Sequence, residues 1–147
     1  MRQLLIFIHL SGVIVWIGGM AFAHFCLRPV AAELLPPPQR LSLLSGVLGR
    51  FFRLVAVALA ALWATGFVRF AQAGAAAPAN WTVMAAIGLL MTVIYLVIVM
   101  RFYHALRAAV AAERWPDGAA AMNRIRQLVF ANLLLGFLTL AVAILGA

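Results

Sequence analysis

The stretch HLSGVIVWIGGMAFAH, residues 9–24, contains no Arg, Lys, Asp or Glu, and it begins and ends with a histidine. It forms the middle of an apolar run over residues 4–27, long enough to cross the ~30 Å hydrocarbon core of a bilayer as a helix. A helix satisfies its own backbone hydrogen bonds, as lipid requires. We therefore expect a membrane-spanning helix over residues 4–27 that holds two imidazoles in apolar surroundings.

Further apolar segments of similar length follow at residues 54–73, 81–104 and 128–145. Apolar side chains make up 67% of the chain, whereas soluble domains are about half apolar. This excess fits lipid as the surrounding solvent. The sequence therefore predicts an all-α integral membrane protein that is a single domain over residues 1–147, folded as an up-down bundle of four transmembrane helices.

The segments between the predicted spans contain helix-breaking signals. The prolines at 36–38 should interrupt any helix, after which residues 39–53 are expected to form a helical lead-in to the second span. The sequence Trp-Pro-Asp-Gly at 115–118 predicts a turn, with a helix resuming directly after it. Residues 28–53 and 105–127 are accordingly expected to be loops on one side of the membrane. The second of these loops should begin as a continuation of the third helix through Arg107 and Arg114.

The charges are distributed unevenly between the two sides of the membrane. All eleven basic residues are Arg, the acidic residues number three, and the formal net charge is +8. Only Arg2 and Arg69 lie near the N-terminus and the second connection, whereas the other nine arginines lie in or beside the first and third connections. The positive-inside rule therefore predicts cytoplasmic first and third connections, with both termini outside. Because topology accounts for the arginines, the basic charge does not indicate a nucleic-acid partner.

One face of the first predicted helix is formed by residues spaced 3, 4, 3 and 4 apart. They are His9, Gly12, Trp16, Gly19 and Ala23. Residues at this spacing share a helix face, and the small ones let a neighbouring helix or a flat ligand approach closely. His24 lies about 60° around the helix from His9 at 100° per residue, so both imidazoles are expected to point into the bundle. A rise of ~1.5 Å per residue separates them by about 22 Å along the axis, so they do not share one ligand.

Histidines on two helices at equal depth are the arrangement that holds a haem iron inside a helical bundle. His24 and His104 end the first and third predicted spans, which run in the same direction, so they form the best pair. Several arginines at this level would serve the haem propionates. They are Arg28, Arg50, Arg53, Arg101 and Arg107. His9 would be a separate ligand near the outer face, with Met84 or Met91 on the third helix as a weaker partner.

Two other interpretations of these side chains stay open. In the first, each histidine donates a single hydrogen bond and serves packing, although ionisable groups within a membrane are more often functional. In the second, soft ligands near the cytoplasmic end bind copper(I). These ligands are His24, Cys26, Met20 and Met100. Methionines in apolar helices usually serve packing, however, and the middle of the membrane offers mainly Thr65 and Asn132 as polar groups.

The opening of the chain resembles that of the copper-resistance D (CopD) domain family. The matching features are His9, Trp16 within the sequence WIGG, Arg28-Pro29, the lead-in QRLSLLSGVLGRFFRLV at residues 39–55, and Thr65-Gly66. The chain is also similar to the HemJ-like family of membrane protoporphyrinogen oxidases, in which a His is followed seven residues later by a Trp and then Gly. Tyr103-His104 and Asn132 fit two further positions of that pattern.

The resemblance implies a four-helix protein of a bacterial-type inner membrane, so that termini on the outer side, as the arginine distribution predicts, would be periplasmic. Its HemJ side implies haem b bound through histidine, with His9 as the first ligand, and its CopD side implies copper transport or tolerance. One position departs from the HemJ pattern, which has a Lys a few residues after a Trp in the third helix. Here Trp81 is followed by Thr82-Val83-Met84-Ala85, and the chain contains no Lys. This departure counts against porphyrinogen oxidation, and whether the chain is an enzyme stays open.

The sequence thus leads us to expect an inner-membrane protein that binds haem b through His9, His24 and His104 and takes part in electron transfer or haem-linked redox chemistry. A quinone or a redox protein would be its partner within the lipid bilayer, and self-association stays open. The remaining expected site residues are Trp16, Arg53, Arg101 and Asn132 for the cofactor, and Cys26 and Met20 for a metal. The alternatives are a copper transport or tolerance protein and a non-catalytic subunit of a membrane complex.

Overall fold

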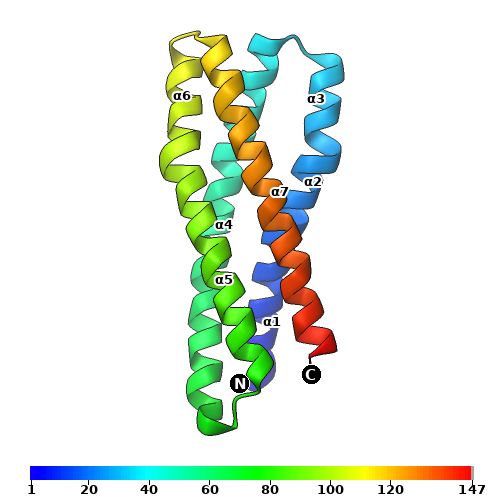
Figure 1. Cartoon of the computed structure of the whole chain (residues 1–147), viewed down its shortest axis with the longest axis vertical. Coiled ribbons are helices and arrows are strands. Elements are labelled where there is room, and N and C mark those ends of the chain that lie inside the picture. Colours follow the sequence, from blue (N-terminus) through cyan, green and yellow to red (C-terminus); the bar gives the residue numbers. More distant parts are fainter. Residues whose placement is uncertain (147) are drawn as a thin grey trace.

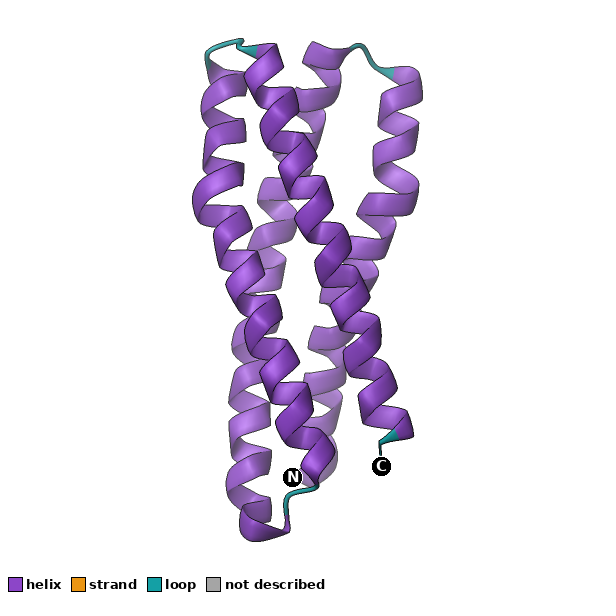
Figure 2. Cartoon of the chain, viewed as in Figure 1, coloured by secondary structure: helices purple, strands orange, loops and turns teal. Residues whose placement is uncertain are grey.

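The computed structural model describes residues 1–146, and all the regular elements in that range are helices. Four long helices pack side by side as a bundle (Figures 1 and 2). Each is long and apolar enough to cross a membrane, and together they cover Arg2–Leu34, Pro37–Ala76, Ala79–Ala111 and Trp115–Leu145. The prediction of an all-helical, multi-pass membrane protein is therefore confirmed.

Short π-helical turns divide the first and third long helices into shorter elements. In chain order the elements are α1 (Arg2–Val13), η1 (Ile14–Gly18), α2 (Gly19–Phe22), η2 (Ala23–Leu27), α3 (Arg28–Leu34), α4 (Pro37–Ala73), the 3-10 turn η3 (Gly74–Ala76), α5 (Ala79–Val97), η4 (Ile98–Tyr103), α6 (His104–Ala111) and α7 (Trp115–Leu145). A π-helical turn adds a residue to the local repeat, so it changes which residues face the bundle beyond it.

The helices alternate in direction along the chain. Both termini and the connection between α4 and α5 lie at one end of the bundle, at the bottom of Figure 1, and the other two connections lie at the opposite end. We call these the termini end and the arginine end. Nine of the eleven arginines lie in residues 28–53 and 101–126, towards the arginine end.

The segments expected to be cytoplasmic loops, residues 28–53 and 105–127, are mostly helical. The long helices contain 31–40 residues, which corresponds to about 46–60 Å at 1.5 Å per residue, well beyond the ~30 Å hydrocarbon core. These connections extend the bundle as helices because they keep a helical repeat of apolar residues despite their charge. Leu41, Leu44, Leu48, Leu106 and Ile125 from this part of the bundle are all buried. The expected helical lead-in over residues 39–53 is confirmed as the first part of α4.

Proline acts as predicted at one connection and differently at the other. Leu35 and Pro36 have extended backbone between α3 and α4, and α4 begins at Pro37. The turn predicted at residues 115–118 is wrong, because the chain turns at residues 112–114, where Glu113 has a φ of 55°. Trp-Pro-Asp-Gly instead begins α7, since proline in a first helical turn loses no hydrogen bond and an aspartate there suits the helix dipole.

The small-residue face predicted on the first helix packs against α4. A Cβ added to Gly12 would lie 3.2 Å from the backbone oxygen of Ala58 and 3.0 Å from Leu62 Cγ. At Gly19 an added Cβ would overlap the ring of Phe51. The two glycines therefore set the close approach of the first helix to α4, and this approach brings the polar groups of the two helices within reach of each other.

Candidate functional site

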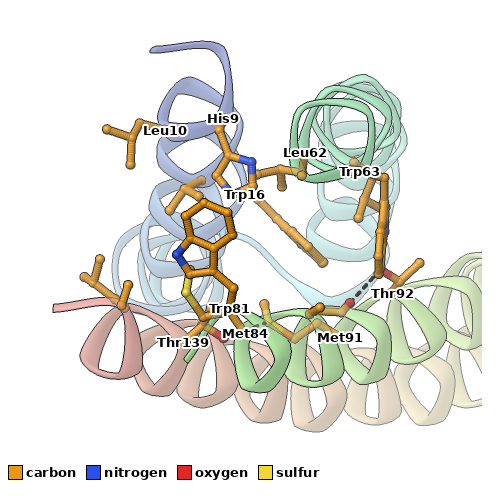
Figure 3. A pocket seen from close by; sticks show the side chains of 18 of the residues that line it. His9, Leu10, Trp16, Leu62, Trp63, Trp81, Met84, Met91, Thr92 and Thr139 are labelled. Carbon is orange, nitrogen blue, oxygen red and sulfur yellow. Dashed lines mark hydrogen bonds between the residues drawn. The ribbon is translucent and has the colours of Figure 1, made fainter. Parts of the chain in front are cut away.

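A cavity of about 390 Å³ lies between all four long helices towards the termini end. Its walls are mainly apolar and include three of the four tryptophans, Trp16, Trp63 and Trp81, which surround the cavity in Figure 3. The polar side chains among the lining residues are His9, Arg69, Thr92 and Thr139. An apolar cavity of this size with a few converging polar groups is typical of a small-molecule site.

His9 is held by a hydrogen bond to α4. Its Nδ1 lies 2.8 Å from Thr65 Oγ1, and that hydroxyl donates its own proton to Ala61 O at 2.6 Å. With the hydroxyl proton assigned to Ala61 O, the hydroxyl oxygen accepts from His9, and this assignment places a hydrogen on Nδ1. In the neutral ring Nε2 then has a free lone pair. This is the arrangement of a ligating histidine, whose second nitrogen donates to a fixed protein oxygen.

The residue after Thr65 lies beside the imidazole. His9 Cε1 lies 4.0 Å from the position that a Cβ on Gly66 would occupy, an ordinary contact distance. Thr65-Gly66, a dipeptide to which the sequence assigned no structural role, therefore lies next to the His9 ring and provides its hydrogen-bond partner. The partner that His9 needs inside an apolar helix is Thr65.

Arg69 follows Thr65 by one turn of α4 and also lines the cavity. Its guanidinium carbon lies 4.4 Å from the centroid of the Trp81 ring, which is the geometry of a cation–π contact. Trp81 belongs to α5, so this contact joins the second and third long helices at the termini end. Arg69 and Trp81 were not among the expected site residues, although Arg69 is one of only two arginines outside the arginine-rich segments.

The methionines suggested as partners for His9 lie around the same cavity. Met84 and Met91 both line it from α5. Thr139 Oγ1 lies 3.9 Å from the sulfur of Met91, which is a weak hydrogen bond, whereas no such contact involves Met84 within residues 1–146. Met84 is therefore the candidate sulfur ligand with fewer competing contacts.

Asn132 lies in the core one turn from Gly136, a cavity-lining residue. Its side chain is 1% exposed, and its Nδ2 donates to Met91 O at 3.1 Å. Its Oδ1 is buried without a hydrogen-bond partner among the described residues. The side chain thus fixes α7 to the backbone of α5 next to the cavity but does not line it.

The structure does not bring His24 and His104 together as a pair. The His24 ring stacks on Phe130 of α7, with centroids 4.7 Å apart, whereas the side chain of His104 is exposed. An extrapolation at 100° per residue ignores the π-helical turns. Since η2 contains His24 and η4 ends directly before His104, both residues lie where these turns change the facing of the helix.

The other expected ligands are dispersed. Arg53 and Arg101 are exposed, and Arg53 donates to Gly49 O within its own helix at 3.3 Å. Cys26 is exposed, whereas Met20 is 2% exposed inside the core. In the part of the chain that the structure describes, no three His, Cys, Asp or Glu side chains converge on a point where they could hold a metal ion.

Comparison with known proteins corrects the expected family. A family model described as "Domain of unknown function (DUF4149)" matches residues 12–114, which is well over half of the chain. The match covers Trp16, Arg69 and Trp81 but begins after His9. No curated protein and no solved structure matches the chain significantly.

The expected resemblance to the CopD and HemJ-like families is therefore wrong, since neither family matches the chain and a different family model does. The residues that suggested it include several with a packing role here, such as Trp16, which is 5% exposed and packs edge-on against Tyr95. Apolar helices converge easily on such patterns. The chain belongs to the DUF4149 family.

Proposed function

We propose that this chain is a multi-pass membrane protein that binds haem b in the cavity between its helices, with His9 Nε2 as the iron ligand, and uses the haem for electron transfer. The observation that carries the proposal is the hydrogen bond between His9 Nδ1 and Thr65 Oγ1, on a ring that lines the cavity. In the tautomer with the hydrogen on Nδ1, Nε2 has a free lone pair. Three tryptophans in the walls suit a flat aromatic ligand.

The number of ligands favours haem over a bare metal ion. A porphyrin supplies four of the ligands of its iron, so one imidazole is sufficient and a methionine sulfur completes the set. Met84 lines the same cavity and is the proposed second ligand. Copper held by the protein alone needs several donors of its own at one point. His9 contacts a threonine and apolar side chains, and it therefore fits the haem better.

The distribution of arginine supports an orientation for the bundle. By the positive-inside rule, the arginine end faces the cytoplasm and the termini end, with the cavity, faces the periplasm of a bacterial-type inner membrane. In this orientation the haem lies near the outer face. Its electrons would be exchanged with a quinone dissolved in the bilayer or with a redox protein at that surface.

The optical spectrum of the protein purified from haem-replete cells tests the proposal. We expect a Soret band in the wild type and its loss or collapse in His9→Ala. His104→Ala is the matched control, because His104 is exposed on α6 and should leave the band unchanged. Colourless wild-type protein, or a band that survives His9→Ala intact, would contradict the proposal. Metal analysis of the same samples detects copper, whose presence without haem would also count against it.

A further inference from the structure

Arg69 is a half-buried cation in a part of the bundle that has no acidic side chain. The three acidic residues of the chain, Glu33, Glu113 and Asp117, all lie at the arginine end. Within residues 1–146 the one ion pair joins Arg114 to Asp117. Arg69 lines the cavity and rests on the ring of Trp81, and no acidic side chain among residues 1–146 pairs with it there.

Membrane topology does not explain this arginine. The positive-inside rule concentrates arginines at the other end and disfavours them at the termini end. Arg2, the other arginine there, is exposed and lies in the first turn of α1. Arg69 is half-buried, and a charge within a membrane protein that faces a cavity is expected to pair with a group of opposite sign.

We infer that the ligand of the cavity is an acidic amphiphile, with a flat or apolar body and a carboxylate, and that Arg69 binds this carboxylate. The inference rests on the proposed function in one respect, namely that the cavity is the binding site. Guanidinium groups bind carboxylates through two parallel charge-assisted hydrogen bonds, and the Arg69 guanidinium carbon lies 4.4 Å from the centroid of the Trp81 ring. The body of the ligand lies among Trp16, Trp63 and Trp81, whose side chains surround one space in Figure 3.

Two sources supply such a carboxylate, the propionates of a porphyrin and the head group of a fatty acid. We favour the porphyrin, because the three tryptophans form flat walls and the cavity also contains an imidazole. The experiment measures binding of metal-free protoporphyrin, its dimethyl ester, oleate and methyl oleate to the full chain in detergent. Metal-free porphyrin offers no iron to His9, so its binding reports the carboxylate contact separately from iron ligation.

We expect wild-type protein to bind metal-free protoporphyrin at least about tenfold more tightly than its dimethyl ester, because the ester cannot form charge-assisted hydrogen bonds. Arg69→Gln should lower the affinity for the acid to that for the ester, and Arg69→Lys should restore part of the difference. Arg2→Gln is the matched control, since it removes the other arginine of the termini end and should keep the preference.

Equal affinity of the wild type for acid and ester in both ligand pairs would overturn the inference. So would a loss of binding in Arg69→Gln that is equal for acid and ester, provided that the variant elutes as wild type in size-exclusion chromatography. The wild type could instead prefer oleate to methyl oleate, lose that preference in Arg69→Gln, and show no preference between protoporphyrin and its dimethyl ester. That result would support the contact between Arg69 and a carboxylate and would contradict haem as the ligand. A carboxylate preference for porphyrin without a His9-dependent Soret band would likewise keep this inference and refute the proposed function.

Discussion

Replacing Thr65 by valine tests the proposed histidine ligand without touching it. Valine has the shape of threonine, so packing against α1 should be preserved while the acceptor for His9 Nδ1 is lost. The structure gives this bond a length of 2.8 Å, and Thr65 is 4% exposed. The Nδ1–H would then be left unpaired, which costs about 1–3 kcal/mol in a buried setting.

Losing the hydrogen bond between His9 and Thr65 should weaken haem binding more than it lowers the stability of the fold. Outer partners of metal-binding histidines contribute about 10–100-fold in affinity, because they fix the ring and make it a stronger donor. We therefore expect Thr65→Val to weaken haem binding within that range and to raise the reduction potential, since a weaker donor stabilises ferric iron less. The assays are titration of the apoprotein with haemin and a potentiometric titration of the bound haem.

Thr65→Ser is the matched control, because it keeps the hydroxyl that accepts from His9 and should retain the affinity to within a few-fold. The reasoning would be refuted if Thr65→Val bound haem as tightly as the wild type at an unchanged potential. It would be refuted as well if Ser and Val lowered the affinity equally, because the effect would then not depend on whether the hydroxyl is present.

Two further substitutions test the second ligand and the packing of the site. Met84→Ala should convert a six-coordinate haem spectrum into a five-coordinate one. Met100→Ala is the control and should leave the spectrum six-coordinate, because the Met100 side chain is 75% exposed. A six-coordinate spectrum in Met84→Ala would assign the second ligand to another residue. Gly12→Leu should destabilise the bundle by about 1–3 kcal/mol or more through overpacking, measured as a lower thermal midpoint in detergent. Gly18→Leu is its control, because nothing lies within 4 Å of a Cβ there, and equal midpoints for the two variants would contradict the role of Gly12.

The fold was predictable because each span carries its own signal. Four apolar segments, alternating connections and the placement of arginine were sufficient for the bundle and the order of its helices. The full lengths of the helices could not be predicted in the same way, because apolar residues such as Leu41, Leu106 and Ile125 are buried in an Arg-rich extension of the bundle. A charged segment of a membrane protein resembles a loop in composition even where its helical repeat continues.

The candidate site was predictable only in part. His9, Trp16, Met84 and Met91 were singled out from the sequence, and all four line one cavity. The pairing of His9 with Thr65 depends on the relative depth of α1 and α4, which the spacing of residues along the chain does not fix.

The facing of His24 and His104 depends on π-helical turns, which residue spacing alone does not predict. Arg69 was the missed signal. It is a charge on the side of the membrane where topology does not require one, and this position in the sequence is sufficient to mark it as a candidate functional residue.

Packing and chemistry at the site depend on the same contact between α1 and α4. Gly12 is three residues after His9 and on the same face, and the backbone oxygen of Ala58 fills the space where its side chain would be. Thr65 follows Ala58 by seven residues, or two turns of α4, so it faces the same helix. A side chain as large as leucine at position 12 would move α1 away from α4 and lengthen the bond between His9 and Thr65 one turn away. Gly12→Leu should therefore lower haem affinity as well as stability. Thr65→Val should then reduce the affinity of the Gly12→Leu variant by less than it reduces that of the wild type, because the bond between His9 and Thr65 is already weakened.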